Sequence, residues 1–313
     1  MRVNRRDFSK MVSAVPVAAM ASPAAGAMPV RPLGTIGLQA GILGFGAQHV
    51  GRPAAPQPTV DRIVAEAMEA GVNYIDTAPN YGASEDLLGP ALKGRRARVF
   101  LSTKIEERTR AGAMEQIRNS LRRLRTDYLD CVQFHNFARD DRWPDVDAVL
   151  GKDGALAALV EAKKQGMIRH IGCTTHSAPS RVIRLFDETQ VDIITCVLNF
   201  VDRQIYGLED TLVPEARRRK IPVVAMKALG GPRKGGGARL DSAGDFTKAL
   251  RYVWSLAGVQ VAIVGFRAPE ELRQGLAAAR EFKPLSASET AALLDRGRIL
   301  AAEWGASRGP VVA

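Results

Sequence analysis

The feature that most constrains the fold of this chain is a regular alternation of short apolar runs with longer amphipathic runs. Strand-like runs occupy residues 41–45, 73–76, 99–103, 129–134, 168–172, 193–198, 223–226 and 261–264. Helix-like runs occupy residues 60–69, 85–93, 113–124, 156–165, 180–188, 208–219, 246–256 and 269–280. Because strands that alternate with helices pair in parallel through right-handed crossovers, eight such units predict an α/β protein built as a (β/α)8 barrel, the TIM barrel.

An open, doubly wound sheet is the competing arrangement, and it normally carries a GxGxxG turn after its first strand. Residues 44–49 of this chain read GFGAQH, so the third glycine is missing and that arrangement is disfavoured. Just before, residues 33–41 are rich in glycine and show little periodicity, which we interpret as an N-terminal hairpin closing the barrel bottom. We therefore expect one barrel domain over residues 28–313.

Four polar residues lie at the C-terminal ends of predicted strands, which is where the functional residues of such barrels are found. Asp76 and Tyr81 follow the second predicted strand, Lys104 the third and His135 the fourth. A tyrosine with a pKa of about 10 is a poor acid at neutral pH, but a nearby ammonium lowers that pKa. A carboxylate would position the lysine, and an imidazole would orient a carbonyl. Singly, each residue has an ordinary structural explanation; together they predict a tuned proton donor that needs a hydride-carrying cofactor.

At these residues the sequence resembles the aldo-keto reductase family. The family's four catalytic positions match Asp76, Tyr81, Lys104 and His135 without a gap. The resemblance implies reduction of an aldehyde or ketone with NAD(P)H, with Tyr81 donating the proton, Lys104 and Asp76 tuning it and His135 orienting the carbonyl. The stretches that carry it are residues 31–47, 71–92 (GVNYIDTAPNYGASEDLLGPAL), 100–104 (FLSTK), 120–135, 166–172 and 264–272.

The expected nicotinamide site departs from the family's usual residues. Thr174 and Thr175 stand where the family usually has Ser-Asn to hold the carboxamide, and Thr195 stands where it usually has glutamine. Met226 replaces the usual stacking aromatic, and Lys227 is expected to reach the pyrophosphate. Residues 226–231 (MKALGG) resemble a branch of the family with an MK-x-LGG pattern.

The expected adenosine site comprises Gly265, Phe266, Arg267 and Glu271. Arg267 is suited to stacking on adenine or pairing with a 2′-phosphate, which favours NADP. The Glu271 carboxylate suits a ribose diol better than a phosphate, so NAD stays possible.

The first 27 residues have the pattern of an export signal. A basic segment with Arg5 and Arg6 precedes an alanine-rich run over residues 11–20, and Ala25-Gly26-Ala27 forms a small-x-small cleavage site. Arg5 and Arg6, followed by Phe8 and Lys10, resemble the twin-arginine motif. We expect this leader, residues 1–27, to engage the export machinery and direct the chain to the periplasm; a disordered basic N-terminus is the alternative. Its apolar run is too short for a stable membrane span.

Composition narrows the remaining function classes. The net charge is +11, but the basic residues are spread along predicted helices without a basic arm, which favours a solvated surface over nucleic-acid binding. The three cysteines are far apart, and no metal site is predicted. A non-catalytic, cofactor-binding barrel that acts as a redox sensor or partner-binding subunit is the main alternative to a reductase. An unrelated barrel hydrolase or isomerase would need a metal cluster or paired carboxylates, which the strand ends lack. The substrate is expected at a mouth lined by residues 136–154, including Trp143.

Overall fold

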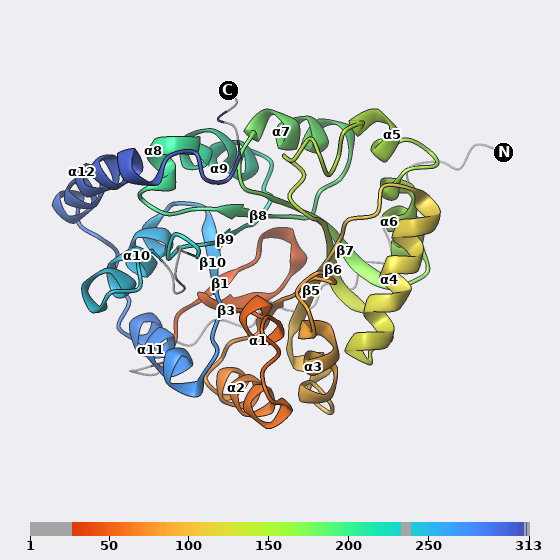
Figure 1. Cartoon of the computed structure of the whole chain (residues 1–313), viewed down its shortest axis with the longest axis horizontal. Helices are drawn as coiled ribbons and strands as arrows, with labels where there is room; N and C mark the ends of the chain where they lie inside the picture. Colours follow the sequence, from red (N-terminus) through yellow and green to blue (C-terminus); the bar gives the residue numbers. More distant parts are fainter. Residues whose placement is uncertain (1–26, 233–238, 310, 312–313) are drawn as a thin grey trace, which may run out of the picture.

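The computed structural model of the chain describes residues 27–232, 239–309 and 311. Apart from Ala27, the predicted export leader lies outside the described residues, so it stays a prediction. Viewed down the shortest axis, a ring of helices surrounds a central barrel of strands (Figure 1).

The barrel consists of eight parallel strands and is closed in the order β10-β3-β4-β5-β6-β7-β8-β9. The predicted (β/α)8 barrel is thereby confirmed, with strand ends shifted by a few residues. The strands are β3 Leu43–Gly46, β4 Tyr74–Asp76, β5 Phe100–Ile105, β6 Leu129–Phe134, β7 Ile168–Thr175, β8 Ile193–Val197, β9 Val223–Met226 and β10 Val259–Val264.

Helices return the chain from the top of each strand to the bottom of the next. Thr109 caps α4 by accepting a hydrogen bond from the Gly112 N–H, and Ser286 with Glu289 forms a capping box on α12. Short helices α1, α5 and α8 and the long α12 are additions that the sequence periodicity did not predict. The helices are α1 Gln48–Gly51, α2 Gln57–Glu69, α3 Ser84–Ala91, α4 Arg110–Leu124, α5 Val146–Leu150, α6 Ala155–Lys164, α7 Pro179–Glu188, α8 Asp202–Tyr206, α9 Leu208–Arg218, α10 Ala243–Ser255, α11 Pro269–Arg280 and α12 Ala287–Trp304.

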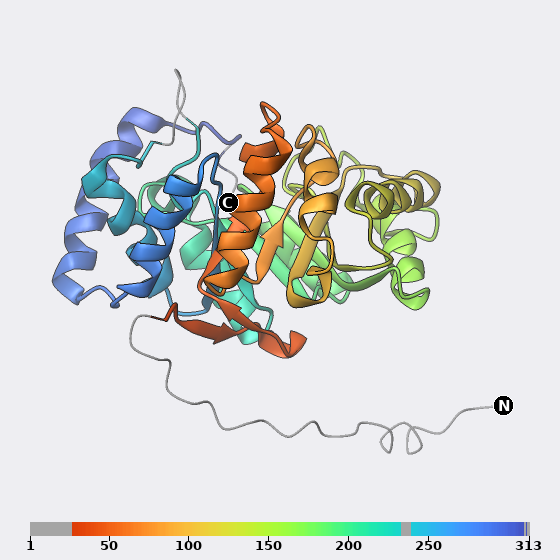
Figure 2. The same cartoon turned by 90° about the horizontal axis from the view of Figure 1, so that it is seen from below.

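The predicted N-terminal hairpin closes one end of the barrel. Strands β1 (Val30–Pro32) and β2 (Gln39–Gly41) pair antiparallel, and the side view shows them beneath the barrel (Figure 2). Leu33 and Ala40 of this hairpin pack with barrel residues such as Tyr74 and Phe100 in one buried cluster. Because an apolar plug covers the bottom, a site for polar ligands has to lie at the opposite end.

The structure also shows the state of the cysteines and the hydropathy of the helices. Cys131, Cys173 and Cys196 are free and buried. Along the described ranges, no helix is both long and apolar enough to cross a membrane.

Candidate active site

Asp76, Tyr81, Lys104 and His135 meet at the C-terminal ends of the barrel strands. Asp76 ends β4, Lys104 lies near the end of β5, and His135 directly follows β6; these three strands are neighbours. The Lys104 Nζ lies 2.5 Å from Asp76 Oδ2 and 4.7 Å from the centroid of the Tyr81 ring. The rings of Tyr81 and His135 meet edge to face, with 5.8 Å between centroids. The structure therefore brings the four predicted residues together.

Lys104 and Asp76 form a buried ion pair within this cluster. Both side chains are almost fully buried, and Lys104 Nζ also donates to the Thr77 carbonyl at 2.7 Å. Burial alone would lower the pKa of Lys104, but the charge of Asp76 and that of an ionised Tyr81 outweigh it and raise the pKa. Lys104 is therefore a fixed positive charge beneath the tyrosine.

The phenol of Tyr81 is held in its protonated form. Burial raises the pKa of Tyr81, while the charge of Lys104 and its hydrogen bond act in the opposite direction. The net shift is upward, whereas the neighbouring ammonium led us to expect a lowered pKa. The reason is desolvation, which disfavours the phenolate more than Lys104 favours it. A protonated phenol next to a cation is a suitable proton donor.

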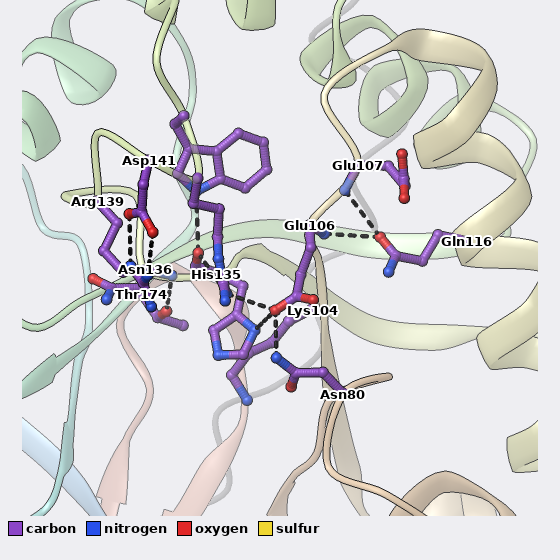
Figure 3. Close-up of polar contacts among 12 residues, drawn as sticks. Asn80, Lys104, Glu106, Glu107, Gln116, His135, Asn136, Arg139, Asp141 and Thr174 are labelled. Atoms are coloured by element: carbon purple, nitrogen blue, oxygen red, sulfur yellow. Dashed lines mark hydrogen bonds and ion pairs between the residues drawn. The ribbon is translucent and has the colours of Figure 1, made fainter.

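His135 is neutral and has a carboxylate partner that the sequence analysis did not single out. The Glu106 Oε1 lies 2.7 Å from His135 Nδ1 (Figure 3). Burial lowers the pKa of His135 to about 4 despite this carboxylate, with Lys104 and Arg142 adding to the effect. Trp143, expected to line the mouth, is fully buried and instead donates from Nε1 to the His135 carbonyl at 3.0 Å.

Gly51 is a second residue of importance that sequence reasoning missed. The loop that carries Tyr81 packs so closely on α1 that a Cβ on Gly51 would lie 1.9 Å from the Tyr81 carbonyl oxygen. The Ala83 N–H donates to the Gly51 carbonyl at 3.3 Å, and Gly82 adopts a positive φ of 61° at the same contact. Only a residue without a side chain allows this approach.

Thr195 belongs to the barrel interior and not to the strand-end cluster. Its hydroxyl donates to Gln133 Oε1 at 2.9 Å, and Gln133 Nε2 donates to Ser102 Oγ at 2.8 Å and lies 3.3 Å from Asp76 Oδ1. Thr195 is completely buried, and its expected place at a cofactor stays a prediction. Its hydrogen bonds support Asp76 through Gln133.

Thr174 and Thr175 are likewise engaged by their own loops. Thr174 Oγ1 accepts from the Asn136 N–H at 2.7 Å, and Thr175 Oγ1 donates to the Ser177 carbonyl at 2.6 Å. The side-chain oxygen of Asn136 also accepts from the His176 N–H at 3.1 Å. The hydroxyls of both threonines thus shape the β6 and β7 loops.

The ends of β9 and β10 carry the remaining expected cofactor residues. Met226 is the last residue of β9, and Lys227 follows it. Burial, with the charge of Arg308, lowers the pKa of Lys227 to about 8, and among the described residues its ammonium makes no ion pair. Phe266 is buried and stacks on Phe45, with 6.1 Å between ring centroids, so only its backbone remains for a ligand.

Arg267 and Glu271 lie at the start of α11 and are linked through the backbone. The Arg267 N–H donates to Glu271 Oε2 at 2.6 Å, which holds that carboxylate close to the main chain. The Arg267 guanidinium is exposed and, within the part of the chain that is described, makes no hydrogen bond.

His49 provides a test of whether a dinucleotide fits here. Its Nδ1 is buried without a hydrogen-bond partner, and its ring covers Gly265 so closely that a Cβ there would lie 1.8 Å from Nδ1. Burial lowers the pKa of His49, and the charges of Arg267 and Lys227 lower it further, so these groups share one region. An unpartnered imidazole nitrogen beside two unpaired cations fits an anionic, hydrogen-bonding ligand such as a dinucleotide phosphate.

Over the described ranges, no group of three or more His, Cys, Asp or Glu side chains is arranged to hold a metal ion.

Comparison with known proteins agrees with this barrel. Residues 42–248 match the model of the aldo/keto reductase family, and the chain belongs to that family of oxidoreductases. The chain is 28% identical to the uncharacterized oxidoreductase YqkF of Bacillus subtilis over 62% of its length, a match that spans 63% of YqkF. It is 27% identical to L-galactose dehydrogenase of Arabidopsis thaliana, covering 85% of this chain and 94% of that protein.

Among solved structures, the holo form of aldo-keto reductase AKR11C1 from Bacillus halodurans is similar. It has a TM-score of 0.71 and 26% identity, and the match covers 86% of this chain and 96% of the other. A structure described as a putative aldo-keto reductase from Pseudomonas aeruginosa gives a TM-score of 0.67 at 28% identity. The match covers 80% of this chain and 94% of the other.

Proposed function

We propose that this protein reduces an aldehyde or ketone to an alcohol with NAD(P)H, using Tyr81 as the proton donor. The observation that carries the proposal is the Lys104 ammonium, which lies 2.5 Å from Asp76 and 4.7 Å from the Tyr81 ring centroid. A carbonyl oxygen that becomes an alkoxide needs a proton, and the Tyr81 phenol supplies it while Lys104 offsets part of the desolvation cost of the phenolate.

The bound nicotinamide would supply a hydride to the carbonyl carbon. Met226 at the end of β9 would pack against its ring, and Lys227 with Arg267 would hold its phosphates. The unpartnered Nδ1 of His49 supports this placement, because a phosphate or ribose hydroxyl would satisfy it. We favour NADP over NAD, since the Arg267 guanidinium is exposed and Glu271 is already held by a backbone N–H.

A small polar aldehyde is the proposed substrate class. Relatives of this chain include proteins named methylglyoxal reductase from Escherichia coli, at 29% identity over 60% of this chain. We further propose that residues 1–27 act as a twin-arginine leader and that the protein works in the periplasm, on the basis of Arg5, Arg6 and the cleavage pattern alone.

The direct experiment measures cofactor binding and carbonyl turnover separately. Binding of NADPH should quench tryptophan fluorescence, and addition of an aldehyde should then consume the cofactor's near-ultraviolet absorbance. The Tyr81→Phe variant should lose turnover roughly 100- to 10,000-fold, because it removes the acid, while its cofactor affinity stays nearly unchanged. Wild-type turnover in Tyr81→Phe would contradict the assigned donor. Binding without turnover of any carbonyl would favour the non-catalytic alternative.

A further inference from the structure

The segment that follows α12 is fixed to the loop after β9 by Arg308. The Arg308 guanidinium donates to Asp202 Oδ2 from Nη2 at 2.6 Å and from Nε at 3.0 Å, and Nη2 also donates to the Gly230 carbonyl at 2.8 Å. The side chains of Arg308 and Asp202 are only 8% and 2% exposed, so this ion pair is buried. Helix α12, which leads into the segment, packs on α8, of which Asp202 is the first residue (Figure 1). Arg308 therefore joins the start of α8 to the loop after β9.

The same loop carries Lys227 beside this ion pair. Lys227 has a φ of 55°, a left-handed conformation that is uncommon outside glycine, and its carbonyl accepts from Asn199 Nδ2 at 3.1 Å. The same nitrogen donates to Asp202 Oδ2 at 2.5 Å, which places Lys227 next to that carboxylate. A Cβ on Gly231 would lie 3.5 Å from Lys227 Cδ and 3.3 Å from Arg308 Nη1. The lysine side chain and the guanidinium therefore occupy neighbouring space at Gly231.

Asp202 is bound by Arg308 through one of its two oxygens. Within the described ranges, Asp202 Oδ1 is buried without a hydrogen-bond partner, and the Lys227 ammonium makes no ion pair. The charge of Asp202 raises the pKa of Lys227, while burial and the charge of Arg308 lower it more strongly. The other titratable groups that face Lys227 are Lys104, His49 and His176. The carboxylate thus acts on Lys227 without binding it.

We propose that Arg308 is a positioning residue that holds the Asp202 carboxylate, so that the Lys227 ammonium stays unpaired for a phosphate of the cofactor. This inference rests on the proposed function, which assigns Lys227 to the phosphates of NAD(P)H. Without Arg308, Asp202 would be a buried charge without its partner, which is costly. A lysine ammonium extends two bonds beyond Cδ, so Lys227 would enter the vacated space and pair with Asp202. A phosphate would then have to break that pair.

The first experiment measures NADPH binding to the full chain by fluorescence titration over a range of pH. Arg308→Met should weaken binding about tenfold at pH 7, as expected for the loss of one charged contact. In the wild type, affinity should fall as the pH rises through the Lys227 pKa of about 8. In Arg308→Met this fall should move up by about one pH unit, because Lys227 gains a carboxylate and loses a repelling cation. Asp202→Asn, which keeps Arg308, should move the fall to lower pH.

The double variant Asp202→Asn/Arg308→Met distinguishes positioning from direct contact. With the carboxylate also removed, Lys227 has nothing to pair with, so most of the affinity should return and the fall should again lie near the wild-type pH. If the double variant bound NADPH as weakly as Arg308→Met, Arg308 would itself hold the ligand and the proposal would be wrong. An unchanged pH profile in Asp202→Asn would also contradict it.

Arg96→Met is the matched control for loss of an Arg–Asp pair. Arg96 Nη2 lies 2.7 Å from Asp130 Oδ2 at the N-terminal ends of β5 and β6, far from Lys227 along the strands, and both side chains are largely buried. Its affinity for NADPH and its pH profile should equal those of the wild type. Equal weakening in Arg96→Met and Arg308→Met would mean that general destabilisation, and not Lys227, is the cause.

The second experiment needs no ligand and follows the free energy of unfolding in urea against pH. Each protein is compared with the same protein carrying Lys227→Met, so that the difference isolates Lys227. In the wild type this difference should change between pH 8 and 10.5, the window between the folded-state and usual pKa of Lys227. Arg308→Met should lose most of that change, and the double variant should regain it. An unaltered change in Arg308→Met would overturn the proposal. Failure of the wild type to bind NADPH or NADH would contradict the proposed function, yet this measurement would still decide the role of Arg308.

Discussion

The two sides of the barrel mouth differ in how their polar groups are satisfied. On the β4–β6 side, the Lys104 ammonium is bound by Asp76 and the Thr77 carbonyl, and Glu106 accepts a hydrogen bond from Asn80 and pairs with Arg142. On the β9–β10 side, the Lys227 ammonium is without an ion pair in the described part of the chain, and the buried Nδ1 of His49 has no partner. The charged groups of the first side are paired within the protein, although Nδ1 of His135 and Oδ1 of Asn80 are buried without a hydrogen-bond partner. On the second side, the cation itself is left for a ligand to pair.

A paired buried charge and an unpaired buried charge contribute differently to stability. A buried ion pair that loses one partner leaves an uncompensated charge, so changes on the β4–β6 side should affect folding as well as chemistry. A desolvated cation without a partner destabilises the fold until an anion binds, so removing a cation on the β9–β10 side should weaken binding without lowering the stability of the ligand-free fold. The following variants test that separation.

Lys104→Met should have the largest effect, on both turnover and stability. It removes the cation beside Tyr81 and leaves the Asp76 carboxylate buried without its partner. We expect turnover to fall more than 100-fold and the free energy of unfolding to fall by about 3 kcal/mol, measured by aldehyde-dependent cofactor consumption and by urea denaturation.

The double variant Asp76→Asn/Lys104→Met is the control for that prediction. With both charges removed, most of the lost stability should return, while turnover should stay low. If the double variant were less stable than Lys104→Met, the ion pair would not be the source of the loss.

Gly51→Ala should have the next largest effect, and it should be confined to the position of Tyr81. The new Cβ would lie 1.9 Å from the Tyr81 carbonyl oxygen, so the loop has to move. A shift of about 1 Å at a reacting group costs turnover roughly 100-fold, and we expect that loss in kcat with little change in cofactor affinity. Gly94→Ala, at a glycine with open space around it, controls for general strain, since its positive φ of 74° adds a backbone strain that Gly51 lacks. Equal kcat values in the two variants would contradict this role of Gly51.

The comparison also shows which parts of the site can be predicted from sequence. Asp76, Lys104 and His135 could be found because parallel neighbouring strands bring their C-terminal ends together, so chain order alone implies proximity. The hydrogen bond from Thr195 to Gln133 could not be predicted, because it depends on which face of β8 the side chain occupies. Gly51 and Glu106 were missed because their contacts depend on loop conformations, which leave no periodic signal.

The barrel could also be predicted from sequence. Eight strand-like runs and a glycine-rich hairpin determine the barrel because each run has to bury its apolar residues between neighbours. Helix α12, with few buried residues, packs on the outside of the barrel and closes no strand connection, so the βα alternation does not require it.

Lys227→Met should have the smallest effect on the fold and a selective effect on binding. Loss of one charged contact to a phosphate is expected to weaken NADPH binding about tenfold, measured by fluorescence titration. Because the pKa of Lys227 is about 8, wild-type affinity should fall as the pH rises through 8, and the variant should lack this fall. Lys164→Met, an exposed residue at the end of α6, is the charge-matched control and should keep the wild-type pH profile.

The sign of the stability change distinguishes Lys227 from Lys104. The folded-state pKa of Lys227, about 8, lies below the usual 10.5, so between these values the unfolded chain binds more protons than the folded one. Stability of the ligand-free protein should therefore rise with pH across that window through Lys227, and the Lys227→Met variant should lose this part of the rise. If Lys227→Met instead destabilised the protein at neutral pH as Lys104→Met is expected to do, Lys227 would have a partner within the fold, and the contrast between the two sides of the mouth would be wrong.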